Sequence, residues 1–230
     1  MIPSIVTICN KGMIELTDNL LNSISKSGMK NDIYIVYLDN ETKDYYKGSN
    51  LIKPVKNNFK YIKSEYCDYG TRTFRNICSK KLPSVLEILT LTKKDVIFID
   101  SDIYIFNDFN KYITEYSDYD LICSVENDST YCSGFIYYKY SDNTIRFIKE
   151  HISLMENKVD SKIYYDDQSV FNDIIRNGFE IDNIGLPEEC FCNGHYVMTN
   201  HVDISNIFTI HANHIVGLDN KKRLLNEFIN

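Results

Sequence analysis

Short runs of apolar residues recur along the chain, and segments with helical spacing separate them. Several runs are apolar throughout instead of alternating with polar residues, as happens when both faces of a parallel sheet are buried. We therefore expect an α/β fold, with a mixed, mostly parallel sheet flanked by helices. The expected strands are 4–10, 33–39, 59–63, 95–100, 119–125, 134–140 and 206–212.

Other segments carry apolar residues at the three- and four-residue spacing of an amphipathic helix. The expected helices are 14–28, 82–91, 166–178 and 220–228. In the third of these, Asp167 lies on the same stripe as Val170, Phe171 and Ile174. The pattern therefore turns a carboxylate at the helix start toward the core, whereas Asp166 before it suits an N-cap.

Composition narrows the class of protein. The chain has 230 residues, 43% of them hydrophobic, and no Gly, Pro or Ser linker divides it, so we expect one domain over 1–230. A net charge of −7 argues against a nucleic-acid partner. Seven cysteines without a paired CxxC spacing, and no apolar stretch of membrane-spanning length, indicate a soluble cytoplasmic protein with no membrane span.

Two carboxylates stand where the strand 95–100 should end. Asp100, Ser101 and Asp102 follow four apolar residues and precede another apolar run. Two like charges beside a buried strand are costly unless a cation lies between them, and carboxylate oxygens suit Mg²⁺ or Mn²⁺ with a substrate phosphate. In open α/β sheets, ligands bind at this end of the strands. The alternative is a surface turn with two solvated acids.

A second polar cluster follows the strand 206–212. It contains His211, Asn213 and His214, and Gly217 and Lys221 come next. An imidazole can complete an oxygen and nitrogen ligand set for Mn²⁺, and a lysine can neutralise phosphate oxygens. The alternative is a polar loop, in which Gly217 makes a turn and Lys221 starts a solvated helix.

The order of five motifs carries a resemblance over most of the chain. The motifs are FIDSD, CSGFIYYK, DDQSVFN, ECFCNGH and HANHIVGLDNK. In this order the chain resembles the nucleotide-diphospho-sugar transferase family, which are metal-dependent glycosyltransferases with a Rossmann-like GT-A fold. The resemblance implies a single transferase domain, with a nucleotide-binding part at about 1–106 and a sugar- and acceptor-binding part at about 107–230. The cysteines and His195 of ECFCNGH lack the spacing of a structural zinc site and are interpreted as loop and packing residues.

The resemblance also implies roles for single residues. The metal ligands are Asp100, Asp102 and His211, with His211 favoured over His214. The donor-binding residues are Thr7, Asn10, Lys81, Asp100, Ser101, Asp102, Gly134, Asn213, Gly217 and Lys221. The catalytic residues are Asp167, Gln168 and Lys221. Among these, Thr7 and Asn10 would lie near the base, and Gly134 would approach the sugar. Lys80 is an equal candidate for the place given to Lys81.

The implied reaction moves a hexose from a UDP-sugar to the hydroxyl of an acceptor that the sequence does not identify, with Mn²⁺ or Mg²⁺. The resemblance favours retention of anomeric configuration. Asp167 could act as nucleophile, or the leaving phosphate could accept the acceptor proton, and we favour the second route because no carboxylate is placed opposite Asp167.

Two other functions stay open. A haloacid-dehalogenase-type phosphatase also uses a strand-end DxD, but near its N-terminus and with a small hydroxyl residue shortly after, whereas Ile103 and Tyr104 follow here. A sugar-nucleotide-binding module without activity is the third reading.

Overall fold

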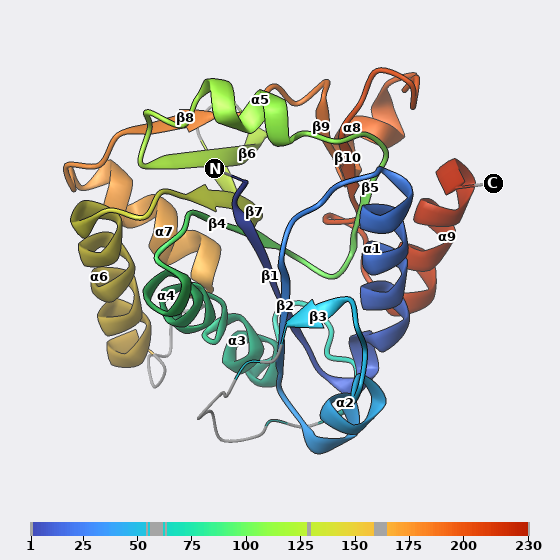
Figure 1. Ribbon diagram of the computed structural model, residues 1–230, viewed down its shortest axis with the longest axis horizontal. Helices are drawn as coiled ribbons and strands as arrows, with labels where there is room; N and C mark the ends of the chain where they lie inside the picture. Colours follow the sequence, from blue (N-terminus) through green and yellow to red (C-terminus); the bar gives the residue numbers. More distant parts are fainter. Residues whose placement is uncertain are drawn as a thin grey trace.

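The computed structural model describes residues 2–53, 55, 62, 64–127, 130–158 and 165–229. A seven-stranded sheet runs through its centre in the order β3-β2-β1-β4-β7-β6-β8 (Figure 1). The pairs β1–β2, β1–β4, β2–β3 and β6–β8 are parallel, and β7 is antiparallel to both β4 and β6. The strands are β1 (Ser4–Cys9), β2 (Ile33–Tyr37), β3 (Ile52–Lys53), β4 (Val96–Ile99), β6 (Leu121–Asn127), β7 (Thr130–Tyr138) and β8 (Asn183–Gly185).

A second, three-stranded sheet lies beside the first. It contains β5 (Ile103–Ile105), β10 (Thr209–His211) and β9 (Phe191–Asn193), in the order β5-β10-β9. Only Asp100, Ser101 and Asp102 separate β4 of the large sheet from β5 of the small one. The three residues therefore form the junction between the two sheets.

Helices cover both sides of the large sheet. In Figure 1, α4, α6 and α7 lie together on one side, while α1 and α9 lie on the other side of the molecule. The longer helices are α1 (Ile14–Lys26), α4 (Lys81–Thr92), α6 (Asp142–Lys158), α7 (Asp167–Arg176) and α9 (Leu218–Ile229). The shorter ones are a 3-10 turn (Lys11–Met13), α2 (Asn40–Tyr45), α3 (Arg72–Cys78), α5 (Asn110–Glu115) and α8 (Gly194–Thr199).

The central strands are apolar because both of their faces are buried. On β4, Phe98 packs into the cluster formed with α4, α6 and α7, whereas Ile97 and Ile99 pack into the cluster that includes α1. Side chains alternate between the faces of a strand, so a strand covered on both sides needs apolar residues at every position. The predicted α/β class with a mixed, mostly parallel sheet is confirmed.

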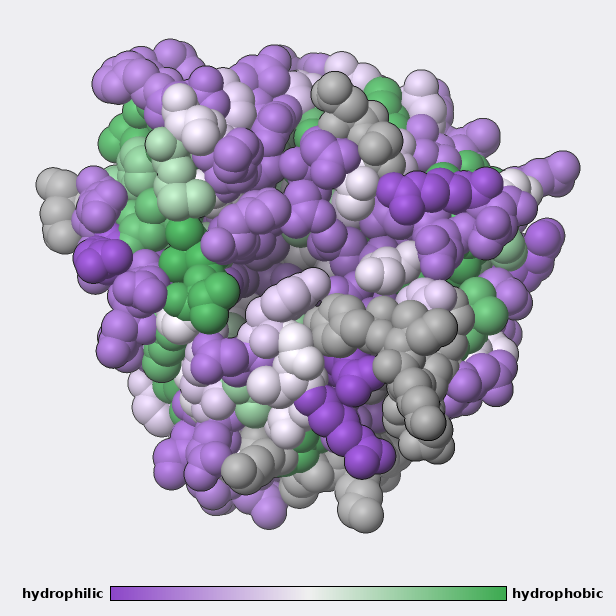
Figure 2. Space-filling view, turned by 180° about the vertical axis from the view of Figure 1, so that it is seen from behind, coloured by the Kyte–Doolittle hydropathy of each residue, from purple (hydrophilic) through white to green (hydrophobic). Residues whose placement is uncertain are grey.

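Some elements differ from the expected ones. The expected strand 59–63 lies almost wholly outside the described residues. The strand expected at 206–212 is shorter, at Thr209–His211. The strands β3, β5, β8 and β9 and the helices α2, α3, α5, α6 and α8 were not predicted. Of the helices in the described part of the chain, none combines the length and the apolar character needed to cross a bilayer. The surface opposite the view of Figure 1 is hollowed near its centre, where hydrophilic and hydrophobic residues meet (Figure 2).

The packing of α6 and α7 against the sheet can be tested by its contribution to stability. Phe171 of α7 is 1% exposed, and its ring packs edge-on against Phe147 of α6 at a centroid distance of 5.1 Å. We expect Phe171→Ala to lower the free energy of unfolding by about 3–5 kcal/mol, because a large cavity opens between two helices and the sheet. Leu91→Ala, at a 63% exposed position of α4, is the control and should cost less than about 0.5 kcal/mol. Guanidinium unfolding measures both, and equal losses would contradict this packing.

Candidate functional site

The junction between the two sheets places the DSD residues. β4 ends at Ile99, and the Asp100 backbone N–H then donates to the Gly134 carbonyl of β7 at 2.7 Å. β5 and β10 pair antiparallel with His211 opposite Ile103, and the Ala212 N–H donates to the Asp102 carbonyl at 3.0 Å. The strand register therefore brings His211 to Asp102 although more than a hundred residues separate them in sequence.

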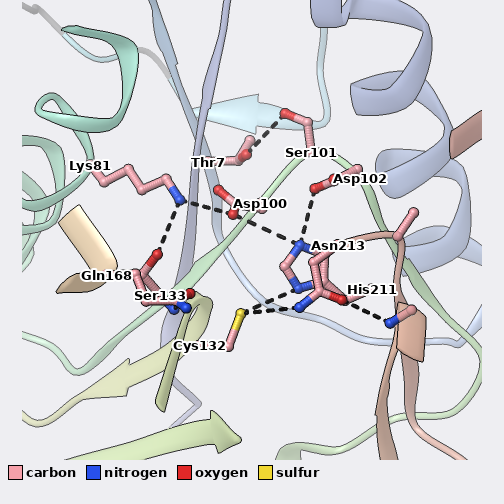
Figure 3. Close-up of polar contacts among 12 residues, drawn as sticks. Thr7, Lys81, Asp100, Ser101, Asp102, Cys132, Ser133, Gln168, His211 and Asn213 are labelled. Atoms are coloured by element: carbon pink, nitrogen blue, oxygen red, sulfur yellow. Dashed lines mark hydrogen bonds and ion pairs between the residues drawn. The ribbon is translucent and has the colours of Figure 1, made fainter. Parts of the chain in front are cut away.

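The three expected metal ligands lie together (Figure 3). His211 Nε2 is 3.3 Å from an Asp102 carboxylate oxygen and 3.9 Å from one of Asp100. One ligand atom from each residue fits within 4.8 Å of the others, and among the described residues this is the group with such spacing. Two carboxylates and an imidazole form a donor set that suits Mn²⁺ or Mg²⁺.

The other ring nitrogen of His211 faces a thiol. Cys132 Sγ lies 3.6 Å from His211 Nδ1, and the Asn213 side-chain amide donates to the same sulfur at 3.7 Å. Asn213 is itself held by the Gly194 N–H, which donates to its side-chain oxygen at 2.8 Å. These contacts orient the imidazole so that Nε2 faces the two carboxylates.

Two lysines compensate the carboxylates. Lys221 Nζ lies 2.5 Å from Asp102 Oδ2 and 2.7 Å from the Ala212 carbonyl oxygen. Lys81 Nζ lies 2.9 Å from Asp100 Oδ2 and 3.3 Å from Asp167 Oδ2. Lys81 is 8% exposed, so its charge bridges two carboxylates away from bulk water.

The pKa directions follow from burial and these ion pairs. Burial raises the pKa of Asp100, and Lys81 offsets that effect only in part. For Asp102, burial opposes ionisation, but Lys221 and His211 hold its pKa well below the usual range. Burial would lower the pKa of His211, yet Asp102 and Cys132 raise it to about 10. Burial thus opposes the negative charge of both carboxylates, and the nearby lysines and His211 offset that effect to different degrees.

The opposite wall comes from β7 and α7. A Cβ on Gly134 would lie 2.7 Å from Asp100 Oδ2 and 3.0 Å from His211 Nδ1, so only glycine fits beside these two side chains. Asp166 caps α7, since its side chain accepts from the Ser169 N–H at 2.8 Å, and Asp167 in the first turn is 4% exposed.

These residues line one cavity of about 530 Å³. Every residue expected for metal, donor or catalysis lines it except Thr7 and Gly217. Thr7 is fully buried and lies 3.4 Å from the Ser101 hydroxyl, so it supports the junction from below. Gly217 has a φ of 89° and marks the turn into α9. Of the two alternative lysines, Lys81 lines the cavity and Lys80 does not.

Sequence reasoning missed several lining residues. Glu126 extends from β6 into the cavity, Cys132 contacts His211, and Tyr66 and Tyr69 form part of the rim. A carboxylate directly after the mostly apolar residues 121–125 was a usable signal for Glu126, because it resembles the pattern of Asp100 after residues 96–99. Tyr66 and Tyr69 belong to YCDYGTRTF, a segment without a readable motif whose expected role from sequence is acceptor recognition.

Comparisons with known proteins were made for sequence and for fold. The profile of the nucleotide-diphospho-sugar transferase family matches residues 27–225. A curated relative, the UDP-galactose:fucoside alpha-3-galactosyltransferase of Dictyostelium discoideum, is 27% identical over 195 residues, which cover 69% of this chain and 30% of that protein. The chain thus spans less than a third of that relative's length.

Two solved structures share the fold. The galactosyltransferase LgtC, in complex with donor and acceptor sugar analogs, superposes with a TM-score of 0.60 at 12% identity, covering 90% of this chain and 86% of LgtC. The glycosyltransferase GlyE of Streptococcus pneumoniae superposes with a TM-score of 0.61 at 13% identity, covering 99% of this chain and 63% of GlyE. The family profile covers most of the chain, the fold is the GT-A fold, and the chain belongs to the nucleotide-diphospho-sugar transferase family of glycosyltransferases.

Proposed function

We propose that the chain transfers a hexose from a UDP-sugar to an acceptor hydroxyl, with Mn²⁺ or Mg²⁺ held by Asp100, Asp102 and His211. One observation carries the proposal, namely the convergence of these three ligand groups within 4.8 Å beside Lys221. A divalent cation bound there would supply the charge that neutralises the leaving diphosphate.

Lys221 and the residues around it would bind the diphosphate. Its ammonium group lies at the start of α9, 2.5 Å from Asp102 Oδ2, so it can stabilise phosphate oxygens next to the metal ligands. Charge on the departing diphosphate grows during transfer, and a fixed ammonium group lowers the barrier to its departure. Asn10, at the end of β1, lines the same cavity and would approach the nucleoside.

Asp167 and Gln168 would bind the donor sugar. Both line the cavity across from His211, at the start of α7. The buried ion pair with Lys81 holds the pKa of Asp167 below its ordinary value against the effect of burial. A carboxylate fixed in this way is better suited to accept a hydrogen bond from a sugar hydroxyl than to act as a nucleophile. We therefore favour retention by the route in which the leaving phosphate takes the proton of the acceptor hydroxyl.

The donor can be tested first. The experiment is a panel of nucleotide sugars scored for metal-dependent release of the nucleotide. UDP-galactose is the first donor in the panel because the name of the curated relative is that of a UDP-galactose-dependent transferase. We expect Mn²⁺-dependent release of UDP that EDTA abolishes, and we expect Asp102→Asn to lower kcat/KM by about 10²- to 10³-fold. Asp142→Asn, on the exposed start of α6, is the matched control and should retain activity.

Other outcomes of the panel assign another function. Hydrolysis of a generic phosphomonoester without any nucleotide dependence would indicate a phosphatase. Metal-dependent protection by UDP against thermal unfolding, with no UDP release, would indicate a binding module.

Lys221 offers a second test. Its ammonium group contacts the same Asp102 carboxylate that a metal would use. We expect Lys221→Met to weaken UDP binding by about 10- to 100-fold, the loss of one charge-assisted contact, but not to weaken binding of Mn²⁺ alone. Lys222→Met, whose side chain pairs with Glu15 and Asp219 outside the cavity, is the neighbouring control. Calorimetric titration separates the two ligands, and weaker Mn²⁺ binding in Lys221→Met would contradict the assignment.

Metal binding should also displace a proton. The pKa of His211 is raised to about 10, so the imidazole is protonated at pH 7.5, whereas a metal ligand must be deprotonated. We expect about one proton released per Mn²⁺ at pH 7.5, and an affinity that rises with pH up to about 10. Titration in two buffers of different ionisation enthalpy counts the proton. His211→Asn should release none, and a wild-type value of zero would contradict a protonated His211 in the metal-free protein.

A further inference from the structure

Glu126 joins three parts of the cavity wall. It lies near the end of β6, its side chain is 20% exposed, and it lines the cavity. One carboxylate oxygen accepts a hydrogen bond from Gln168 Nε2 of α7. The other lies 3.0 Å from His214 Nε2, in the loop between β10 and α9. Both oxygens of this carboxylate are therefore engaged by neighbouring side chains.

The contacts of Gln168 fix which way its amide points. Its Oε1 accepts from the Ser133 backbone N–H at 3.2 Å, and its Nε2 donates to Glu126. A backbone N–H can only donate and a carboxylate can only accept, so a flipped amide would set donor against donor and acceptor against acceptor. The amide has one orientation, with its oxygen beside Ser133 and Gly134 and its nitrogen turned toward Glu126.

The oxygen side of this amide is the metal side of the cavity. Gly134 follows Ser133 and lies against both Asp100 and His211, as the 2.7 Å and 3.0 Å distances from its Cβ position show. Gln168 Oε1 therefore lies on the side of the amide next to Ser133, whose neighbour Gly134 contacts the side chains of Asp100 and His211.

His214 ties the network to the C-terminal loop. Its backbone has a φ of 59°, a left-handed conformation that is uncommon for a residue other than glycine. The contact with Glu126 engages the side chain of His214, which lies three positions before Gly217, where the chain turns toward Lys221. Glu126 therefore links the loop that carries Lys221 to the amide of Gln168.

We propose that Glu126 is a positioning residue, which holds the carbonyl oxygen of Gln168 toward the donor sugar, and that His214 keeps Glu126 in place. The proposal rests on the transferase function proposed above. Positive charge develops at the anomeric carbon as the glycosidic bond to the diphosphate breaks, and an oriented carbonyl oxygen stabilises that charge. Glu126 acts through Gln168 and does not itself contact the reacting carbon.

A double-mutant cycle tests the coupling. Glu126→Leu should lower kcat about 10- to 100-fold and leave KM for the donor within about twofold. The reason is that a misoriented amide loses an interaction with charge that develops only in the transition state. Glu126→Gln keeps an acceptor for Gln168 and should recover most of the rate. In a Gln168→Ala background, Glu126→Leu should cause no further loss. Glu150→Gln, on the exposed face of α6, is the control for the loss of an acidic residue.

Two results would overturn the proposal. Losses that multiply in the double variant would show that Glu126 acts independently of Gln168, for example on the acceptor. A raised KM for the donor with unchanged kcat would show that Glu126 contributes to binding of the donor in the ground state and not to the catalytic step.

An inactive wild-type protein would instead refute the transferase function, and the orientation would then be judged without turnover. The ¹⁵N–¹H signals of the Gln168 side-chain amide should shift in Glu126→Leu and not in Glu150→Gln. Unshifted signals in Glu126→Leu would show that Glu126 does not hold the amide.

Discussion

Three of the carboxylates that line the cavity, those of Asp100, Asp102 and Asp167, are paired with cations from other parts of the chain. Asp102 and Asp167 are buried and Asp100 is 20% exposed at its side chain, so each needs a nearby cation to stay ionised. Lys81 pairs with Asp100 and Asp167, whereas Lys221 and His211 pair with Asp102. No short segment can provide this set, because the cations come from α4, β10 and α9.

This requirement explains the division into two sheets. β4 carries Asp100 to the edge of the large sheet, and the chain then crosses to β5, where the antiparallel partner β10 delivers His211. α9 follows within a few residues and directs Lys221 back to Asp102. The C-terminal third of the chain therefore completes a site that the first hundred residues begin. The same loop carries His214, whose contact with Glu126 joins the metal side of the cavity to the sugar side.

The sequence predicted the elements whose signals are local. An apolar strand followed by Asp100 and Asp102 is visible in a ten-residue window, and the helical stripe of α7 correctly turned Asp167 inward. Other features depend on long-range register. β5 and β9 have three residues each, too short for a periodicity, and the approach of Glu126 to Gln168 follows from the pairing of β6 with β7. Thr7 lies inside β1, and the alternation of side chains along the strand places it against Ser101 instead of in the cavity.

The central claim is that Asp100, Asp102 and His211 bind one divalent cation together with a nucleoside diphosphate. Anomalous diffraction from crystals grown with Mn²⁺ and UDP tests it directly. The account predicts one manganese peak within about 2.5 Å of a ligand atom from each of the three side chains, with diphosphate oxygens completing the coordination. A manganese ion located elsewhere, or His211 Nε2 beyond coordination distance while both carboxylates bind, would contradict it.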